Sequence, residues 1–161
     1  GIVLLLKHFY GQNILEVILM RVKEIMTKSI ASLNVEDTVE HAAQLMKEHN
    51  IGSLPVCNGE KVIGIITDRD IALRSTAEGE NVQKQTVRDI MTSNPVIVSP
   101  EIDAQEAARI MSERQIRRLP VVENNNLVGI VSLGDISVEP NLGHNAGKAL
   151  SEISEPSTPN I

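Results

Sequence analysis

Apolar residues follow a helical period in two stretches of the chain. They recur at intervals of three and four residues, which places their side chains on one face and predicts an amphipathic helix in each stretch. Asn50 and Gln115 stand at the expected helix ends. The recurring positions are Val39, Ala42, Ala43 and Met46 in the first stretch, and Ala104, Ala107, Ala108 and Met111 in the second.

Two short apolar runs follow each predicted helix. In the first half they are Leu54–Cys57 and Val62–Ile66, joined by Asn58-Gly59. This pair tolerates positive φ and predicts a tight β-hairpin. The second half replaces the turn with residues 124–126, all asparagine. A further helix is expected from Asp68 to Leu73, and short extended segments are expected at Ala31–Val35 and Val96–Val98.

The two halves are copies of one unit. A displacement of 65 residues aligns residues 22–73 with 87–138 without a gap, at 17 identities in 52 positions. Each copy reads β-α-β-β-α, and about 50 residues is near the size at which a core becomes marginal. We therefore expect an α/β (α+β) fold in which the two units pack face to face with pseudo-two-fold symmetry.

The pattern divides the chain into an extension (1–19), a first unit (20–74), a polar linker (75–85), a second unit (86–138) and a C-terminal region (139–161). In the last region, Asn145–Ile153 predicts a helix, and the composition that follows is typical of disorder. The extension is interpreted as lying outside the repeats, with a segment that packs on a partner as the alternative. Its apolar runs are far shorter than the ~20 residues of a membrane span, so no membrane association is expected.

Composition narrows the function classes. The formal net charge is −6, and the aromatic residues are Phe9 and Tyr10 alone. An acidic surface repels phosphate backbones, and a chain without further aromatic rings cannot stack bases, so no nucleic-acid partner is expected. The single cysteine, Cys57, cannot form an intramolecular disulfide, which favours a reducing compartment and a cytoplasmic location.

Three motifs occur once in each half at the same displacement. They are Ile-Met-Thr at 25–27 and 90–92, Leu-Pro-Val at 54–56 and 119–121, and Gly-Ile-(Ile/Val)-(Thr/Ser)-x-x-Asp-Ile at 64–71 and 129–136. With them the chain resembles a tandem cystathionine β-synthase (CBS) domain pair, also called a Bateman module, over residues 21–138. The resemblance implies two clefts between the units, adenosyl ligands such as AMP, ATP or S-adenosylmethionine, and a homodimer.

The pairs Thr67 with Asp70 and Ser132 with Asp135 stand at strand-to-helix junctions. One interpretation is a capping box, in which hydroxyl and carboxylate satisfy backbone N–H groups. The other is a ribose site, because two carboxylate oxygens can accept from both hydroxyls of a cis-diol. Both roles are compatible, and the duplication favours the ribose site.

The resemblance places phosphate contacts at Arg117 and Arg118, and arginine binds phosphate bidentately. Gly52 and Ser53 hold the equivalent positions of the first copy, so one phosphate clamp is missing. Because the family's clefts meet near the pseudo-two-fold axis, these arginines could also serve a nucleotide held by Asp70. A solvated arginine pair is the alternative interpretation.

For adenine, the resemblance implies the segments after each Ile-Met-Thr: Ser29, Ile30 and Ala31 in the first copy, and Pro95 and Val96 in the second. Ile30 replaces the family's usual proline, so the first copy departs from the family pattern for adenine at this position. Short strands with a polar approach are the alternative interpretation.

No catalytic or metal site is expected. His41 and His49 lie eight residues apart on one predicted helix and point about 80° away from each other, which does not suit one ion. Cys57 is interpreted as a buried structural cysteine. Arg69 and Arg74 are expected to face solvent from their helix, and an approach to ligand phosphates is the alternative.

The leading hypothesis is a regulatory sensor that binds an adenosyl ligand and passes a conformational signal to a separate, unidentified protein. A structural dimerisation or adaptor module with degenerate ligand sites is the alternative. A small enzyme acting on nucleotides is a third hypothesis, and it predicts turnover of ATP.

Overall fold

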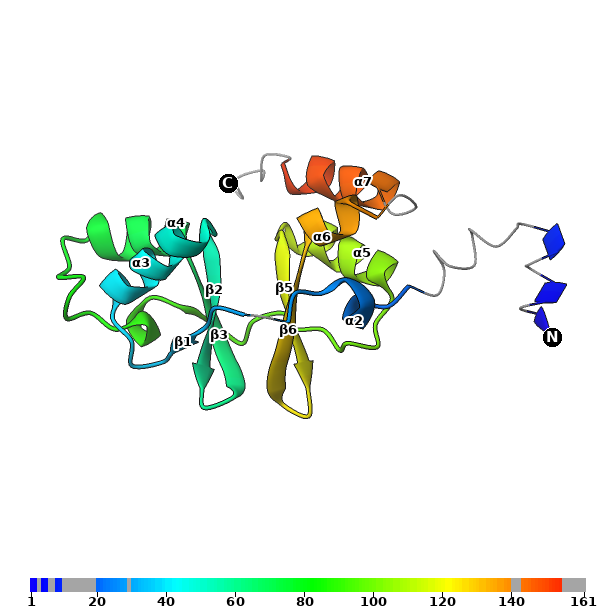
Figure 1. Ribbon diagram of the computed structural model, residues 1–161. Helices are drawn as coiled ribbons and strands as arrows, with labels where there is room; N and C mark the ends of the chain where they lie inside the picture. Colours follow the sequence, from blue (N-terminus) through cyan, green and yellow to red (C-terminus); the bar gives the residue numbers. More distant parts are fainter. Residues whose placement is uncertain (3, 6–7, 10–19, 29, 140–142, 155–161) are drawn as a thin grey trace. The chain divides into compact units, whose positions relative to one another are not determined.

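A computed structural model describes residues 1–2, 4–5, 8–9, 20–28, 30–139 and 143–154. The fold is mixed α+β (Figure 1). Its named elements are α2 (Val22–Ile25), β1 (Leu33–Asn34), α3 (Val39–His49), β2 (Ser53–Asn58), β3 (Lys61–Thr67), α4 (Asp68–Ile71), the π-helix η1 (Ala72–Thr76), the 3₁₀-helix η2 (Val87–Asp89), β4 (Thr92–Ser93), α5 (Ala104–Arg114), β5 (Arg118–Glu123), β6 (Asn126–Ser132), α6 (Leu133–Ser137) and α7 (Gly143–Ile153).

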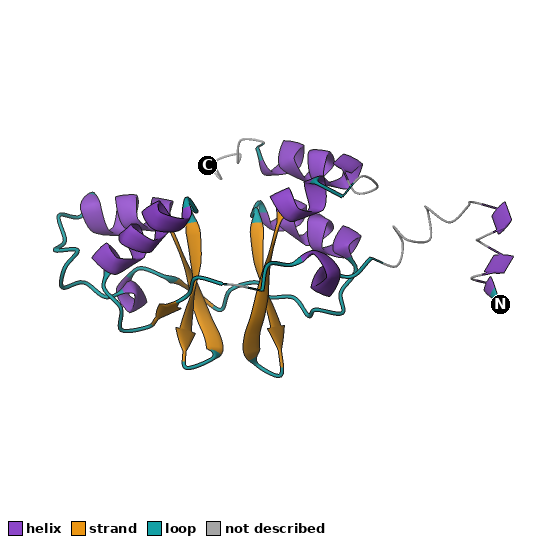
Figure 2. Cartoon of the chain, viewed as in Figure 1, coloured by secondary structure: helices purple, strands orange, loops and turns teal. Residues whose placement is uncertain are grey.

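The chain forms two compact units. The first-repeat unit contains residues 29–97 and 122–128, and the second-repeat unit contains residues 1–28, 98–121 and 129–161. In each unit the helices lie on one side of the strands (Figure 2). The segment that opens each sequence repeat therefore belongs to the unit built mainly from the other repeat.

In the first-repeat unit, β2 lies between β1, which is parallel to it, and β3, which is antiparallel. β4 pairs antiparallel with the other edge of β3. Gly59 has a φ of +64° in the β2–β3 turn, which confirms the tight hairpin predicted there. In the second copy, Asn124 and Asn125 adopt positive φ at the equivalent turn.

The two amphipathic helices begin and end with side-chain and backbone caps. Thr38 Oγ1 accepts from the His41 N–H at 3.1 Å before α3, and Asp103 accepts from the Gln105 N–H at 3.1 Å before α5. Such caps satisfy backbone donors that the first helical turn leaves unpaired. Asn50 and Gln115 end the helices in the left-handed conformation, as their sequence positions predicted.

Each unit has its own apolar core, which the predicted helix faces supply in part. Helix α3 contributes Val39, Ala42 and Met46. The first-repeat core also contains Leu33, Val35, Leu54, Val56, Ile66, Val87 and Ile90. The buried apolar residues of the second-repeat unit include Val22, Val98, Ala104, Ala107, Ala108, Met111, Leu119, Val121, Val131, Leu133, Ile136, Ala146 and Ala149.

Residues 75–85, expected as a polar linker, pack on the first-repeat unit. Ser75 is fully buried in η1, and Val82 lies against the apolar core. The Gln85 carbonyl accepts from the Val39 N–H at 2.9 Å. The segment therefore contributes to the core although its side chains are mostly polar.

A methionine from the segment that opens each repeat packs against a glycine in the hairpin of the other repeat. A Cβ added to Gly129 on β6 would lie 2.5 Å from Met26 Sδ, and one added to Gly64 on β3 would lie 2.5 Å from Met91 Sδ. Thr27 exchanges two backbone hydrogen bonds with Ile130, and Thr92 pairs with Ile65. Only glycine admits the methionine so close to the strand.

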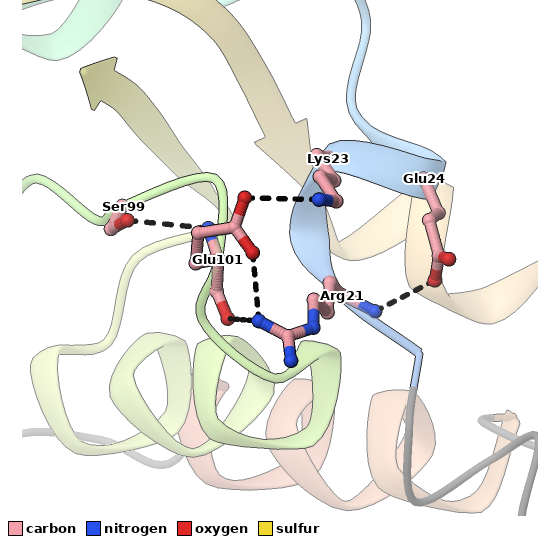
Figure 3. A network of polar contacts seen from close by, with 5 residues as sticks. All are labelled: Arg21, Lys23, Glu24, Ser99 and Glu101. Atoms are coloured by element: carbon pink, nitrogen blue, oxygen red, sulfur yellow. Dashed lines mark hydrogen bonds and ion pairs between the residues drawn. The ribbon is translucent and has the colours of Figure 1, made fainter.

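A polar network fastens residues 20–28 to the second repeat (Figure 3). Glu101 accepts from Arg21 Nη1 at 2.7 Å and from Lys23 Nζ at 3.0 Å (Figure 3). Backbone hydrogen bonds join the same two segments: the Val22 N–H donates to the Ile102 carbonyl at 2.9 Å. The ion-pair side chains are half-exposed, whereas Val22 is fully buried, so the backbone bonds and the burial of Val22 should contribute most to the attachment.

The pKa of Glu101 predicts a small pH-dependent effect. The hydrogen bond from Lys23, helped by the charges of Lys23 and Arg21, lowers this pKa below its ordinary value of 4.5. A lowered folded pKa stabilises the fold above pH 4.5, and this contribution disappears as pH falls through the folded pKa. Glu101→Gln should therefore lower Tm slightly at pH 7.

Thermal unfolding of Glu101→Gln and of the unaltered protein between pH 2.5 and pH 7 checks this. The Tm difference should shrink toward acid, and it should also shrink in 1 M salt because the ion pairs are exposed. A difference that grows as the pH falls would show that Glu101 acts through something other than these cations.

Helix α7 completes the second-repeat unit. It packs on α5 and α6 (Figure 1). Its buried residues include Ala146 and Ala149. The sequence predicted a helix from 145 to 153, and the observed helix begins two residues earlier. The predicted disordered tail lies outside the described residues, as does most of the extension 1–19. Among the described residues, no helix has the length and apolar character needed to cross a bilayer.

Candidate functional site

Both Thr/Ser-x-x-Asp turns form reciprocal capping boxes. Thr67 Oγ1 accepts from the Asp70 N–H at 3.1 Å, and Asp70 Oδ2 accepts from the Thr67 N–H at 2.9 Å. Ser132 and Asp135 repeat the arrangement at 3.0 and 2.8 Å. The capping interpretation is thus confirmed for both turns.

The capping box uses one oxygen of each aspartate. No described residue donates a hydrogen bond to Asp135 Oδ1. Asp70 Oδ1 lies 3.9 Å from Arg74 Nε, too far for a hydrogen bond. Each turn therefore holds its carboxylate in a fixed orientation while leaving one oxygen for a hydroxyl donor. The ribose role of Thr67, Asp70, Ser132 and Asp135 stays a prediction that this geometry permits.

Arg74 is largely exposed, as expected, and its guanidinium also has partners in the protein. Its guanidinium lies beside Asp70 and donates through Nη1 to the Ile90 carbonyl at 3.2 Å, although 56% of the side chain is exposed. Arg74 thus connects the Asp70 turn to the segment that precedes β4. The equivalent position in the second repeat is Glu139, so this connection exists in one copy alone.

A cavity of about 450 Å³ opens beside the Ser132 turn in the second-repeat unit. Arg117 and Arg118 line it together with Ser132, so two predicted phosphate residues and one predicted ribose residue meet at one cavity. Asp135 does not line it. The remaining walls are Leu133, Gly134, Ser137, Ala146, Gly147 and Leu150. This environment combines two cations with a largely apolar wall, which suits a phosphate-bearing ligand.

The predicted adenine segments fall in the first-repeat unit. Pro95 and Val96 are half-buried and follow β4 after one intervening residue, Asn94. β4 pairs with β3 upstream of Thr67. Ala31 packs against the first-repeat core, and Ile30 is half-buried. Ser29 lies outside the described residues. The structure thus places Pro95 and Val96 in the same unit as Asp70, and adenine contact stays a prediction.

The alternative that Arg117 or Arg118 serves a nucleotide held by Asp70 also stays a prediction, because these residues belong to different compact units. Among the described residues, no group of three or more histidine, cysteine or acidic side chains is placed to hold a metal ion. Cys57 is buried in β2, and burial raises the pKa of its thiol, so it has the character of a core residue.

A family model for the CBS domain matches residues 22–75 and 87–139, which covers both repeats with their Asp turns. The chain belongs to the CBS-domain family. It is a tandem CBS pair, and the duplicated motifs of the sequence are the motifs of the two CBS domains.

Several CBS proteins are similar over most of the chain. The CBS domain-containing protein YhcV of Bacillus subtilis is 44% identical over 133 residues, covering 83% of this chain and 94% of that protein. A crystal structure of Hypoxic Response Protein I with two coordinated zinc ions matches with a TM-score of 0.70 and 33% identity, covering 74% of this chain and 98% of that one. The CBS domain pair of protein MJ0100, in complex with 5′-methylthioadenosine and S-adenosyl-L-methionine, matches with a TM-score of 0.62 and 32% identity, covering 74% and 94%.

Two contributors to the candidate sites were missed by sequence reasoning. One is the wall that α7 supplies to the Arg117 cavity through Ala146, Gly147 and Leu150. The other is Asp68, whose carboxylate lies over Gly52. The repeat alignment contained a signal for Asp68, since this acidic residue aligns with the apolar Leu133 of the second repeat. No comparable signal existed for α7, which lies beyond the repeated region.

Proposed function

We propose that this CBS pair is a regulatory sensor that binds an adenosyl ligand, such as AMP, ATP or S-adenosylmethionine, and passes a conformational signal to a separate protein. The observation that carries the proposal is the duplicated turn, in which Asp70 and Asp135 are each fixed through one oxygen and keep another available. The MJ0100 complex supports the adenosyl class, since that CBS pair holds two such compounds.

Regulation requires that the ligand bind two arrangements of the protein with different affinity. In the proposed mechanism, the adenosyl ligand contacts the Asp turn through its ribose and a neighbouring segment through its base. Such a ligand links elements that are separate in sequence. We further propose that the protein is a homodimer, as the resemblance implies. We also propose a cytoplasmic location, which the free, buried Cys57 supports because thiols persist in a reducing compartment.

Thermal unfolding tests the binding step. A ligand at 100 times its Kd adds about 2.7 kcal/mol to the free energy of unfolding. Millimolar AMP, ATP or S-adenosylmethionine should therefore raise Tm, whereas guanosine nucleotides should have a much smaller effect. Adenosyl compounds that leave Tm unchanged would contradict the sensor and favour the adaptor, for which Gly52 and Ile30 in the first repeat are the supporting residues.

The sensor proposal includes no chemical step. Incubation of the pure protein with ATP, followed by nucleotide separation, should return ATP alone. Formation of ADP or AMP in proportion to protein concentration would instead indicate a nucleotide-processing enzyme.

A further inference from the structure

In each CBS domain a backbone hydrogen bond joins the residue before the hairpin to the first residue of the helix after it. We call this place the corner of the domain, and its side chains differ between the two repeats. The Asp68 N–H donates to the Gly52 carbonyl at 2.9 Å, and the Leu133 N–H donates to the Arg117 carbonyl at 2.9 Å. Because the 65-residue displacement converts one bond into the other, side chains at these positions are directly comparable. The second-repeat corner carries Arg117, Arg118 and Leu133, whereas the first-repeat corner carries Gly52, Ser53 and Asp68.

Asp68 occupies space where the second repeat begins its arginine side chain. A Cβ added to Gly52 would lie 3.0 Å from Asp68 Oδ2 and 3.3 Å from Asp68 Cγ. Asp68 Oδ1 accepts from the Arg69 N–H at 2.8 Å, which orients the carboxylate. The first-repeat corner thus carries one negative charge in place of the two positive charges of the other corner.

Nearby cations do not reverse this difference. Arg74 is positioned between Asp70 and the Ile90 carbonyl, so its charge is directed to the Asp70 turn rather than to the corner. Arg69 is exposed and directly follows Asp68 on α4. In the repeat alignment its position corresponds to Gly134.

We propose that Asp68 is a specificity-determining residue that excludes phosphate from the first-repeat site, so that the two CBS domains bind different adenosyl ligands. The site beside Arg117 and Arg118 takes a phosphate-bearing nucleotide. The site beside Asp68 takes an adenosyl compound without phosphate, such as a neutral thioether or a cationic sulfonium. A carboxylate repels the phosphate, which is also an anion, but does not repel a neutral thioether or a cationic sulfonium. Repulsion between like charges thus discriminates between the ligands. The inference rests on the proposed adenosyl function.

Isothermal titration calorimetry with ATP and 5′-methylthioadenosine tests the inference on the full chain. The unaltered protein should bind one ATP, and saturating ATP should leave a site for one 5′-methylthioadenosine. S-adenosylmethionine, titrated in parallel, should behave as 5′-methylthioadenosine does. Competition between ATP and both phosphate-free compounds for one site would overturn the inference.

Three variants separate the two corners. Asp68→Asn preserves size and removes the charge, so ATP should bind a second site with at least tenfold higher affinity than in the unaltered protein. Arg117→Gly with Arg118→Ser copies the first-repeat residues and should weaken ATP binding at least tenfold without changing 5′-methylthioadenosine binding. Arg69→Gly, the control, should leave the ratio of the two affinities unchanged.

The possible failures are distinct. If none of the adenosyl compounds binds, the proposed function fails and the inference fails with it. If they bind but Asp68→Asn does not raise the affinity for ATP relative to that for 5′-methylthioadenosine, the inference alone is wrong, whatever the arginine variant does. Circular dichroism of each variant identifies any loss of folding, and the Asp68→Asn gain of affinity cannot arise from unfolding.

Discussion

Gly64→Ala and Gly129→Ala should each destabilise the protein by about 1–3 kcal/mol, although alanine normally stabilises a strand or helix relative to glycine. The added Cβ would lie 2.5 Å from a methionine Sδ in each case, and also 3.0 Å from the Thr92 carbonyl or 3.2 Å from the Thr27 carbonyl. Methionine can shift, but the backbone oxygens belong to the paired strands and have little freedom to move.

Thermal unfolding measures the effect, since about 1 kcal/mol corresponds to about 2–4 °C in Tm for a chain of this size. Gly147→Ala is a matched control: Gly147 lies inside α7, and nothing lies within 4 Å of its added Cβ. That substitution should raise the free energy of unfolding by about 0.5–1 kcal/mol. If Gly64→Ala raised Tm as Gly147→Ala is expected to do, the close contact between Gly64 on β3 and Met91 would be contradicted.

The second large effect concerns ligand affinity. Asp70→Asn combined with Asp135→Asn should weaken the binding of both AMP and 5′-methylthioadenosine by about 10- to 100-fold while preserving the fold. Asparagine keeps an oxygen that can accept the N–H of Thr67 or Ser132, but it lacks the charge that strengthens a hydrogen bond from a ribose hydroxyl. Hydrogen bonds to charged groups contribute about 1.5–3 kcal/mol, and 1.4 kcal/mol corresponds to tenfold in affinity.

The chain contains its own control for this prediction. Thr86 and Asp89 form a capping box of the same sequence spacing at η2, with the Thr86 N–H donating to Asp89 Oδ2 at 3.3 Å. This turn lies outside both repeated Asp motifs. Asp89→Asn should leave the affinity for either ligand unchanged, and an equal loss in Asp89→Asn would show that the effect is a general loss of capping.

Local sequence signals predicted most of the fold because they act over a few residues. The helical spacing from Val39 to Met46 and the turn residues at 58–59 each fix one element. Asn50 and Gln115 ended their helices as predicted, since a left-handed cap needs a residue that tolerates positive φ. The repeat then supplied the architecture, because one recognised unit occurs twice.

The arrangement of the opening segments could not be predicted in the same way. Nothing in the sequence around Met26 shows that it packs on Gly129, 103 residues later, instead of on Gly64 in its own repeat. The two glycines have the same surroundings in sequence, so the choice is made by chain connectivity and packing. The polar composition of residues 75–85 likewise concealed that Ser75 and Val82 pack into the first-repeat unit.

For the candidate sites, the sequence predicted the chemical type of the side chains better than the contacts that they make. The spacing predicted a capping box at Asp70 and at Asp135, which the structure confirms, and the ribose role of both carboxylates stays a prediction. The sequence predicted that Arg74 faces solvent, which its exposed side chain confirms, but it did not predict the hydrogen bond from the guanidinium to the Ile90 carbonyl. Contacts of this kind depend on tertiary distance, which neither periodicity nor motif spacing encodes.

The central claim is that the two aspartates bind a ribose cis-diol. The most direct measurement compares, by calorimetric titration, the affinities of the unaltered protein for AMP and for 5′-methylthioadenosine with those for their 2′,3′-dideoxy analogues. If the carboxylates accept from the ribose hydroxyls, each dideoxy analogue should bind at least tenfold more weakly than its parent compound. Equal affinity for parent compound and analogue would show that the sugar hydroxyls are not recognised and would contradict the account.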